Sequence, residues 1–243
     1  MSHCCVKGFQ WEAKPKGTEE NLAGRDCYIT GSNKDVAIMI IHDLFGWTFS
    51  NTRVLADHYA AEIDATVYVP DFFGGEKIPV DIIQDESRWA ELDLPSFIKR
   101  NNKSVRGPEI FECAKELRSR HRRTGAMGFC YGGWGVFQLA GEGNQLVDCI
   151  SVAHPTLLEH QEIENVSVPV QILAPEIDPQ FTPELKAFCH KTIPTLGVAY
   201  DYQHFPRLEH GFAIRGDLRK PGEKEGMERA KNAAVLWFSQ WLH

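Results

Sequence analysis

Cys130 lies in the stretch Gly128-Phe129-Cys130-Tyr131-Gly132-Gly133, whose residue types and spacing could support nucleophilic chemistry. The apolar residues 126–129 predict the end of a buried strand, and residues 132–140 predict a helix packed against it. Where a strand turns directly into a helix, the corner residue is strained and exposed, and flanking glycines let the two backbones approach. Such a nucleophile elbow would present the Cys130 thiol and direct the Tyr131 N–H at a developing oxyanion. The pattern is weak alone, because a free cysteine is often only a small buried apolar residue.

A carboxylate and an imidazole follow two later predicted strands. Asp178 lies in the turn after one of them, and we prefer it to Glu176 because it lies further into the turn. His210 lies in a loop between the last predicted strand and the last predicted helix. A thiol nucleophile needs a base to take its proton and a third group to orient that base. The order Cys130, Asp178, His210 is typical of the α/β-hydrolase architecture and predicts a catalytic triad.

The elements that must position these residues alternate between strands and helices. Residues 36–41 form the most continuous apolar run, and their β-branched content predicts a central strand buried on both faces. The alternation predicts an α/β fold of the α/β-hydrolase type, a doubly wound, mostly parallel sheet with helices on both faces. The predicted strands cover residues 27–30, 36–41, 66–70, 126–129, 149–153, 168–174 and 198–205. The predicted helices cover residues 52–63 with Asn51 as N-cap, 108–121, 132–140, 183–191 and 224–242, the last with Leu236 among its core-facing residues.

The length and composition fit a single domain over residues 1–243. The chain is 43% apolar and 24% charged, which is ordinary for a globular protein. Residues 1–26 are polar, and we expect them to form an N-terminal arm. Residues 76–107 predict short helices interrupted by Pro95, and we expect a cap-like segment over the site.

Charge and cysteine usage restrict the partners and the compartment. A net charge of −7 argues against nucleic acid or an anionic membrane as a partner. The first residues lack the apolar core of a secretory signal, and no apolar run is long enough to span a membrane. Seven scattered cysteines without a C-x-x-C pair favour a reducing, cytoplasmic location. His3-Cys4-Cys5 has metal-ligand residue types, but no second cluster has matching spacing, so we expect a flexible terminus, no metal and no organic cofactor.

With these residues in view, the chain resembles the dienelactone hydrolase family of carboxymethylenebutenolidase-like proteins, nearest its eukaryotic branch, whose substrates are unassigned. The resemblance runs from about residue 36 to the end of the chain. It rests on Asp43-Leu44-Phe45-Gly46, Pro70-Asp71-Phe72, the elbow around Cys130, Asp178, and His210-Gly211-Phe212-Ala213.

The resemblance implies a mechanism. Cys130 would attack an ester or lactone carbonyl to form an acyl-enzyme, while His210, oriented by Asp178, moves the proton. The backbone N–H groups of Leu44 and Tyr131 would form the oxyanion hole. The implied substrate is a small ester or lactone, with or without a carboxylate, bound by a monomer or homodimer.

The resemblance also implies roles for neighbouring residues. Asp43 stands where the family commonly has a glutamate that contacts the thiol and gates its ionisation, and aspartate is one methylene shorter. The family's substrate-carboxylate arginine lies four residues past the histidine, where this chain has Ile214, so we transfer the role to Arg215. Arg215 could instead pair with Asp217. Arg88 is the candidate for the family's cap arginine.

Several alternatives stay open. Phe45 and Trp47 could line the pocket, although aromatic residues beside a core strand often only pack there. The same triad would also serve a thioesterase or a general carboxylesterase. A catalytically idle α/β-hydrolase used as a binding module is a further alternative, although an intact Cys130, Asp178 and His210 argue against it.

Overall fold

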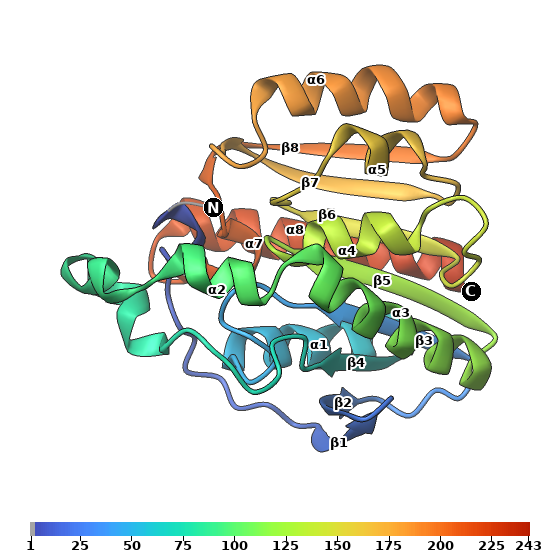
Figure 1. Cartoon of the computed structure of the whole chain (residues 1–243), viewed down its shortest axis with the longest axis horizontal. Coiled ribbons are helices and arrows are strands. Elements are labelled where there is room, and N and C mark those ends of the chain that lie inside the picture. The colour runs from blue at the N-terminus through green and yellow to red at the C-terminus, as the bar shows by residue number, and fades with distance from the viewer. Residues whose placement is uncertain (1–2) are drawn as a thin grey trace.

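The computed structural model describes residues 3–243 and contains one eight-stranded sheet with the strand order β1-β2-β4-β3-β5-β6-β7-β8 (Figure 1). The strands β3 to β8 are parallel to one another, whereas β2 near one edge pairs antiparallel with both of its neighbours, β1 and β4. The strands are β1 Thr18–Leu22, β2 Arg25–Thr30, β3 Val36–Ile41, β4 Thr66–Pro70, β5 Arg123–Phe129, β6 Cys149–Ala153, β7 Val170–Ile177 and β8 Tyr200–Glu209. This is the predicted doubly wound, mostly parallel α/β architecture.

Helices cover both faces of the sheet (Figure 1). The α-helices are α1 Ser50–Ile63, α2 Leu94–Arg100, α3 Lys103–Arg120, α4 Gly132–Leu139, α5 His160–Glu164, α6 Pro183–Thr192, α7 Phe212–Arg215 and α8 Pro221–Leu242. The 3₁₀ helices are η1 His3–Cys5, η2 Val80–Gln84, η3 Glu86–Glu91 and η4 Ile193–Leu196. Within residues 3–243 no helix combines the length and apolar character that crossing a bilayer requires.

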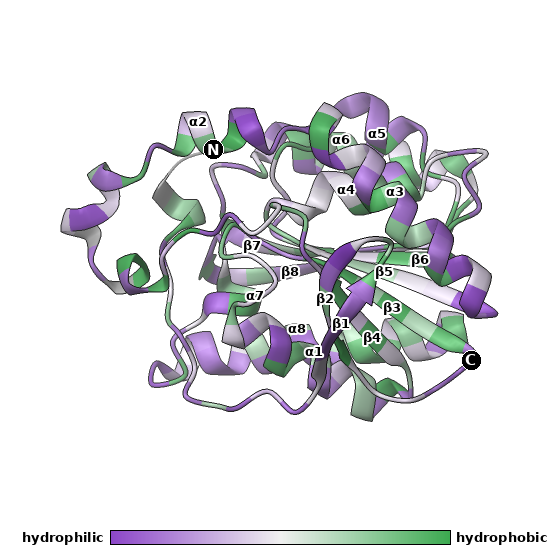
Figure 2. Ribbon diagram, turned by 60° about the horizontal axis from the view of Figure 1, so that its bottom comes forward, coloured by the Kyte–Doolittle hydropathy of each residue, from purple (hydrophilic) through white to green (hydrophobic). Residues whose placement is uncertain are grey.

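The central strand β3 contributes side chains to two apolar cores, one on each face of the sheet. Ala37, Met39 and Ile41 belong to one apolar core, and the alternate residues Val36, Ile38 and Ile40 belong to a second core on the opposite face. All six side chains are buried, because successive residues of a strand point to opposite faces. In Figure 2 the central strand β3 is green, whereas the edge strand β1 is purple.

Several details differ from the sequence-based predictions. β1 lies inside the predicted N-terminal arm, where its exposed residues Thr18 to Asn21 lack the alternating apolar pattern that identifies a strand. α3 begins at Lys103 rather than at Pro108, because the Asn102 side chain accepts the N–H groups of Ser104 and Val105. α8 begins at Pro221 rather than residue 224. Leu236, predicted to face the core, is 72% exposed.

Asn51 was predicted as the N-cap of α1, and this prediction is wrong. The helix begins at Ser50 after Phe49, and Asn51 is buried in its first turn. Its side chain accepts the Trp11 N–H at 2.8 Å and donates to the carbonyls of Phe9 at 2.8 Å and Ile214 at 2.9 Å. Asn51 therefore fixes the N-terminal segment against α7, next to the end of β8.

Candidate active site

The backbone at Cys130 forms a sharp corner between β5 and α4. Cys130 has φ +49°, which is uncommon for a residue other than glycine. Its N–H donates to the Ala153 carbonyl at 3.2 Å, and its carbonyl accepts the N–H groups of Gly133 at 3.0 Å and Thr156 at 2.9 Å. A Cβ on Gly132 would lie 2.0 Å from the Ile41 carbonyl oxygen. The strained corner is thus held by three backbone hydrogen bonds and depends on a glycine for the close approach of α4 to β3.

His210 and Asp178 meet at the carboxyl ends of β7 and β8. The His210 Nδ1 lies 3.0 and 2.9 Å from the two Asp178 carboxylate oxygens, and both side chains are fully buried. Asp178 Oδ1 also accepts the backbone N–H groups of Gln180 at 2.8 Å and Phe181 at 3.1 Å. These bonds orient the carboxylate, and the carboxylate orients the ring. The alternative acid, Glu176, instead accepts the Arg207 N–H at 2.6 Å on the surface.

Asp178 also sets the charge of the imidazole. Burial alone would lower the pKa of His210, but Asp178 first and then the Cys5 thiol, through contact and charge, outweigh burial and raise the pKa to about 9. The ring therefore carries a proton at neutral pH. An imidazolium in this position can stabilise a thiolate as an ion pair and can later donate its proton to a leaving group.

Two backbone N–H groups are available near Cys130. Leu44 follows β3, Tyr131 follows Cys130, and β3 and β5 are adjacent in the sheet. Neither N–H donates to a backbone or side-chain acceptor within residues 3–243. Unpaired backbone donors inside a folded chain are rare, so these two groups are suited to bind an oxyanion.

Asp43 is held in a buried ion pair with Arg215. Both side chains are fully buried, and Arg215 Nη1 donates to one Asp43 carboxylate oxygen. The other oxygen accepts the Phe45 N–H at 3.0 Å. Burial alone would lower the pKa of Arg215, but Asp43 first and then Cys130 raise it, so the guanidinium lies within electrostatic reach of the thiol. The alternative partner of Arg215, Asp217, is bonded to Arg219 instead.

The remaining predicted residues are placed differently. Phe45 is fully buried, with its ring 5.6 Å from the Arg215 guanidinium carbon. The guanidinium of Arg53 lies over the Trp47 ring, 4.7 Å from its centroid. Arg88 lies on η3 and forms ion pairs with Asp81 and Glu91. Neither Arg88 nor Trp47 is among the described residues that line a cavity beside His210.

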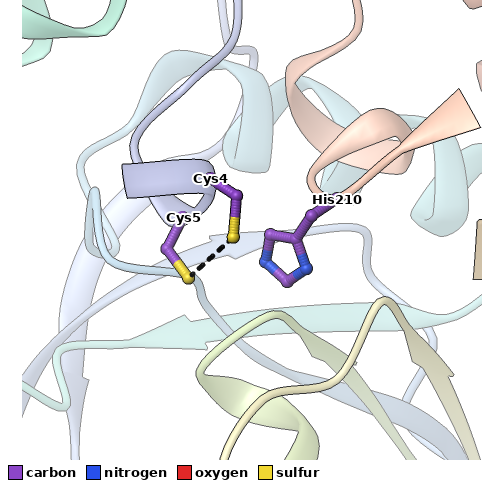
Figure 3. Close-up of side chains that lie close together, drawn as sticks. All are labelled: Cys4, Cys5 and His210. Atoms are coloured by element: carbon purple, nitrogen blue, oxygen red, sulfur yellow. Dashed lines mark hydrogen bonds between the residues drawn. The ribbon is translucent and has the colours of Figure 1, made fainter. Parts of the chain in front are cut away.

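The N-terminal segment closes the site, and the sequence did not reveal this. The Cys4 and Cys5 sulfurs and a His210 ring nitrogen all lie within 4.8 Å of one another (Figure 3). The segment is fixed here because Arg215 Nε donates to the Lys7 carbonyl at 3.0 Å. Cys130 was expected to be exposed at the corner, but it is fully buried, and the equally buried Cys5 thiol contacts it. The only signal in the sequence was the adjacent pair of cysteines, which has no local pattern that identifies its partner.

His154 is a second buried histidine that the sequence did not single out. It follows β6 with φ +41°, and its ring centroid lies 4.9 Å from that of His210. Burial, and then the charges of His210 and Arg215, lower the pKa of His154 well below its ordinary value. The neutral ring packs against His210 and helps to fix its plane.

A cavity of about 400 Å³ opens beside His210. Its walls include Phe9, Ile83, Trp89 and Phe212, together with Arg207 and Arg215. Residues from the segment 76–107, from the N-terminal segment and from the loop around His210 therefore share one cavity. Its size suits a small organic molecule.

Comparisons with known proteins identify the family and the fold of the chain. A model of the dienelactone hydrolase family matches residues 26–242. A hydrolase named pyvD from Aspergillus violaceofuscus is 29% identical, with 99% of this chain and 97% of the relative covered. A carboxymethylenebutenolidase homolog from Homo sapiens is 27% identical, with 98% and 96% covered. The solved structure of a dienelactone hydrolase from Anabaena variabilis has a TM-score of 0.66 at 14% identity, covering 95% of this chain and 99% of that one.

The structural likeness supports the fold, and the family match covers most of the chain, including every residue of the elbow and of the His210 loop. The chain therefore belongs to the dienelactone hydrolase family and is a hydrolase that acts on carboxylic ester bonds.

Proposed function

We propose that this hydrolase cleaves a small lactone or ester through a Cys130–His210–Asp178 triad and an acyl-enzyme. The observation that carries the proposal is the strained corner at Cys130, which has φ +49° and follows β5. In the same sheet, β6 separates β5 from β7. The ends of β7 and β8 carry the buried, hydrogen-bonded Asp178–His210 pair. A residue is held in such a conformation at a cost of about 1–3 kcal/mol, which is common where function requires the side chain to be presented. The chemistry needs no metal and no organic cofactor, and we assign it to one domain.

The proposed reaction has two steps. In the first, the Cys130 thiolate attacks the carbonyl carbon, and the N–H groups of Leu44 and Tyr131 stabilise the resulting oxyanion. The C–O bond to the leaving group then breaks, and protonated His210 donates its Nε2 proton to the leaving oxygen. The product of this step is a thioester on Cys130 and a neutral imidazole.

In the second step, neutral His210 removes a proton from water, and the hydroxide attacks the thioester carbonyl. The C–S bond breaks, which releases the carboxylic acid and regenerates the thiolate beside imidazolium. Asp178 keeps the ring oriented in both steps and stabilises its charged form. The small cavity beside His210 favours a small substrate.

Arg215 and Asp43 are proposed to control the thiol and the substrate. The guanidinium can stabilise the Cys130 thiolate, and Asp43 opposes that effect by neutralising the guanidinium. The Arg215 Nη2 is buried and has no hydrogen-bond partner in the described part of the chain. Arg215 is among the residues that line the cavity, and its unused donor is the group we propose to pair with a carboxylate carried by the substrate.

A panel of fluorogenic esters, lactones and thioesters tests the proposal. Wild type should hydrolyse the small esters or lactones, and Cys130→Ala should lose at least ~10³-fold in kcat/KM. The matched control is Cys189→Ala, since Cys189 is a buried thiol on α6 that is not among the residues lining the cavity beside His210. A Cys130→Ala variant with the wild-type rate would contradict the triad. A preference for thioesters would change the substrate class, and a folded wild type without any turnover would favour a binding module.

A further inference from the structure

Three chemical groups with metal-ligand character converge at the end of the N-terminal segment. They are the thiols of Cys4 and Cys5 on η1 and the imidazole of His210 after β8. Their ligand atoms lie within 4.8 Å of one another, and the two sulfurs are 3.9 Å apart. Figure 3 shows the two sulfurs and the His210 ring facing the same space from opposite sides. The side chain of His3 lies outside the described part of the chain.

The spacing matches a tetrahedral zinc site closely. Two Zn–S bonds of about 2.3 Å at a tetrahedral angle place the sulfurs ~3.8 Å apart, which is nearly the observed 3.9 Å. A Zn–N bond of about 2.0–2.1 Å requires an S···N separation of ~3.6 Å. The sulfurs and the His210 nitrogen are at most 4.8 Å apart, so the cysteines at the end of the short helix η1 need to move by about 1 Å to reach that separation.

The histidine has one ring nitrogen free for this purpose. Its Nδ1 is bonded to Asp178, so a neutral ring has its proton on Nδ1 and its lone pair on Nε2. The Nε2 atom is buried and has no hydrogen-bond partner within residues 3–243. A buried nitrogen without a partner is costly, and this one lies toward two thiols. A histidine held by a carboxylate at one nitrogen is also the usual arrangement of a zinc ligand.

We infer that Cys4, Cys5 and His210 form a binding site for a thiophilic divalent cation of the Zn²⁺ class, and that the bound cation switches hydrolysis off. Zinc prefers thiolate and imidazole ligands, whereas Ca²⁺ and Mg²⁺ prefer oxygen ligands. Two thiolates neutralise a divalent cation, so the occupied site carries no net charge into its buried surroundings. The fourth coordination position is left for water or for the neighbouring Cys130 thiol, whose contact with Cys5 raises the pKa of Cys5.

Inhibition of hydrolysis follows because the cation would bind to the His210 Nε2 atom. In the proposed reaction, His210 Nε2 donates a proton to the leaving group and later takes one from water. A cation bonded to Nε2 prevents both transfers. It also ties η1 to the loop after β8, so that the N-terminal segment stays over Cys130. The binding itself does not depend on the proposed hydrolysis; only its inhibitory effect does.

Binding is tested first, on the full-length protein without an activity readout. Titration of metal-free wild type with Zn²⁺ should show one tight equivalent, and Co²⁺ should give the thiolate charge-transfer and d–d bands of a tetrahedral site. X-ray absorption of the Zn²⁺ complex should report two sulfur neighbours and at least one nitrogen. A cobalt spectrum without thiolate bands would overturn the proposal, whether or not the protein hydrolyses any ester.

Variants then locate the site. Cys4→Ala and Cys5→Ala should each weaken Zn²⁺ binding by at least ~100-fold, because removing even an outer-sphere partner of a metal ligand costs about 10–100-fold. Cys4 is partly exposed, so Cys4→Ala is expected to fold normally. The matched control Cys189→Ala should bind Zn²⁺ as wild type does. Equal affinity in wild type and in the Cys4→Ala/Cys5→Ala double variant would mean an adventitious ion and would overturn the assignment.

Inhibition is tested last, by measuring the hydrolysis rate of each protein with Zn²⁺ and dividing it by the rate of the same protein without metal. One equivalent of Zn²⁺ should abolish hydrolysis by wild type and by Cys189→Ala, and a chelator should restore it. The Cys4→Ala/Cys5→Ala double variant should need at least ~100-fold more Zn²⁺ for the same inhibition. If Zn²⁺ inhibits the double variant as strongly as wild type, the cation acts at another site and the proposed inhibition through Cys4 and Cys5 is wrong.

Discussion

The buried Asp43–Arg215 pair lies beside Cys130, so a change in either residue reaches both the stability of the fold and the reactivity of the thiol. Asp43→Ala leaves a guanidinium buried without its counter-charge. Breaking such a pair costs about 3–5 kcal/mol of unfolding free energy. The unneutralised guanidinium should also favour the thiolate, so iodoacetamide should alkylate Cys130 faster at neutral pH while turnover falls.

The control for this prediction is Asp43→Asn, which keeps a carbonyl oxygen for the Phe45 N–H but removes the charge. Asn should raise alkylation in the same direction as Ala. Unchanged alkylation kinetics in both variants would mean that Asp43 caps its loop without acting on the thiol.

The His210–Asp178 pair makes stability depend on pH. The pKa of His210 is about 9 in the fold against an ordinary 6.5, so protonation favours the folded chain. This stabilisation is complete below pH 6.5 and is lost as the pH rises to about 9. Tm should therefore fall by several degrees across that range, since ~1 kcal/mol corresponds to about 2–4 °C in a chain of this size. Asp178→Asn should flatten the slope, and an equal slope in both proteins would refute the assignment.

At the scale of elements, the crossing of β3, β5 and α4 depends on Gly132. Its substitution by Ala would place a Cβ 2.0 Å from the Ile41 carbonyl oxygen, and backbone would have to move. Gly132→Ala should cost several kcal/mol of unfolding free energy and abolish activity. Gly222→Ala in α8 is the matched control: nothing lies within 4 Å of its Cβ, so it should be neutral or stabilising by about 0.5–1 kcal/mol. Equal denaturation midpoints in the two variants would contradict the close approach.

The same elements separate what the sequence could predict from what it could not. Local patterns located β3, the corner at Cys130, and the turns that carry Asp178 and His210, because each of these depends on residues that are close in sequence. The exposed strand β1 and the role of Asn51 depend on partners far along the chain. Asn51 bonds to Phe9, Trp11 and Ile214, and no local pattern contains that information. The contact of Cys4 and Cys5 with His210 likewise joins residues far apart in the chain, so no local pattern could predict it.

At the scale of the whole molecule, both ends of the chain contribute charge to one cavity. Lys7, Arg219 and Lys220 each form an ion pair with an acidic side chain at its wall. Arg207 forms no ion pair in the described chain, and Arg215 retains an unused donor. The chain has a net charge of −7, so this is a local concentration of cations that would attract an acidic substrate.

Carboxylate recognition can be separated from a structural role of Arg215. A partly desolvated guanidinium–carboxylate pair is worth on the order of 2 kcal/mol, or roughly thirtyfold in affinity. Arg215→Gln should lower kcat/KM on a neutral ester, because it removes the charge that stabilises the Cys130 thiolate and leaves Asp43 unpaired. On an acidic ester of matched size it should lose that factor of roughly thirty in addition. Arg207→Gln, which removes another cation from the lining of the same cavity, is the variant with which Arg215→Gln is compared. An equal loss on both esters in Arg215→Gln would mean that Arg215 only holds Asp43 and the N-terminal segment.

The most direct measurement of the central claim is the mass of the protein during turnover. Wild type mixed with a slowly hydrolysed lactone and quenched in acid should gain the full mass of the lactone, because ring opening retains the alcohol on the acyl group. Peptide mapping should place the adduct on Cys130, and Cys130→Ala should form no adduct and lose turnover. Hydrolysis at the wild-type rate by Cys130→Ala, or an adduct on another residue, would contradict catalysis by a Cys130 acyl-enzyme.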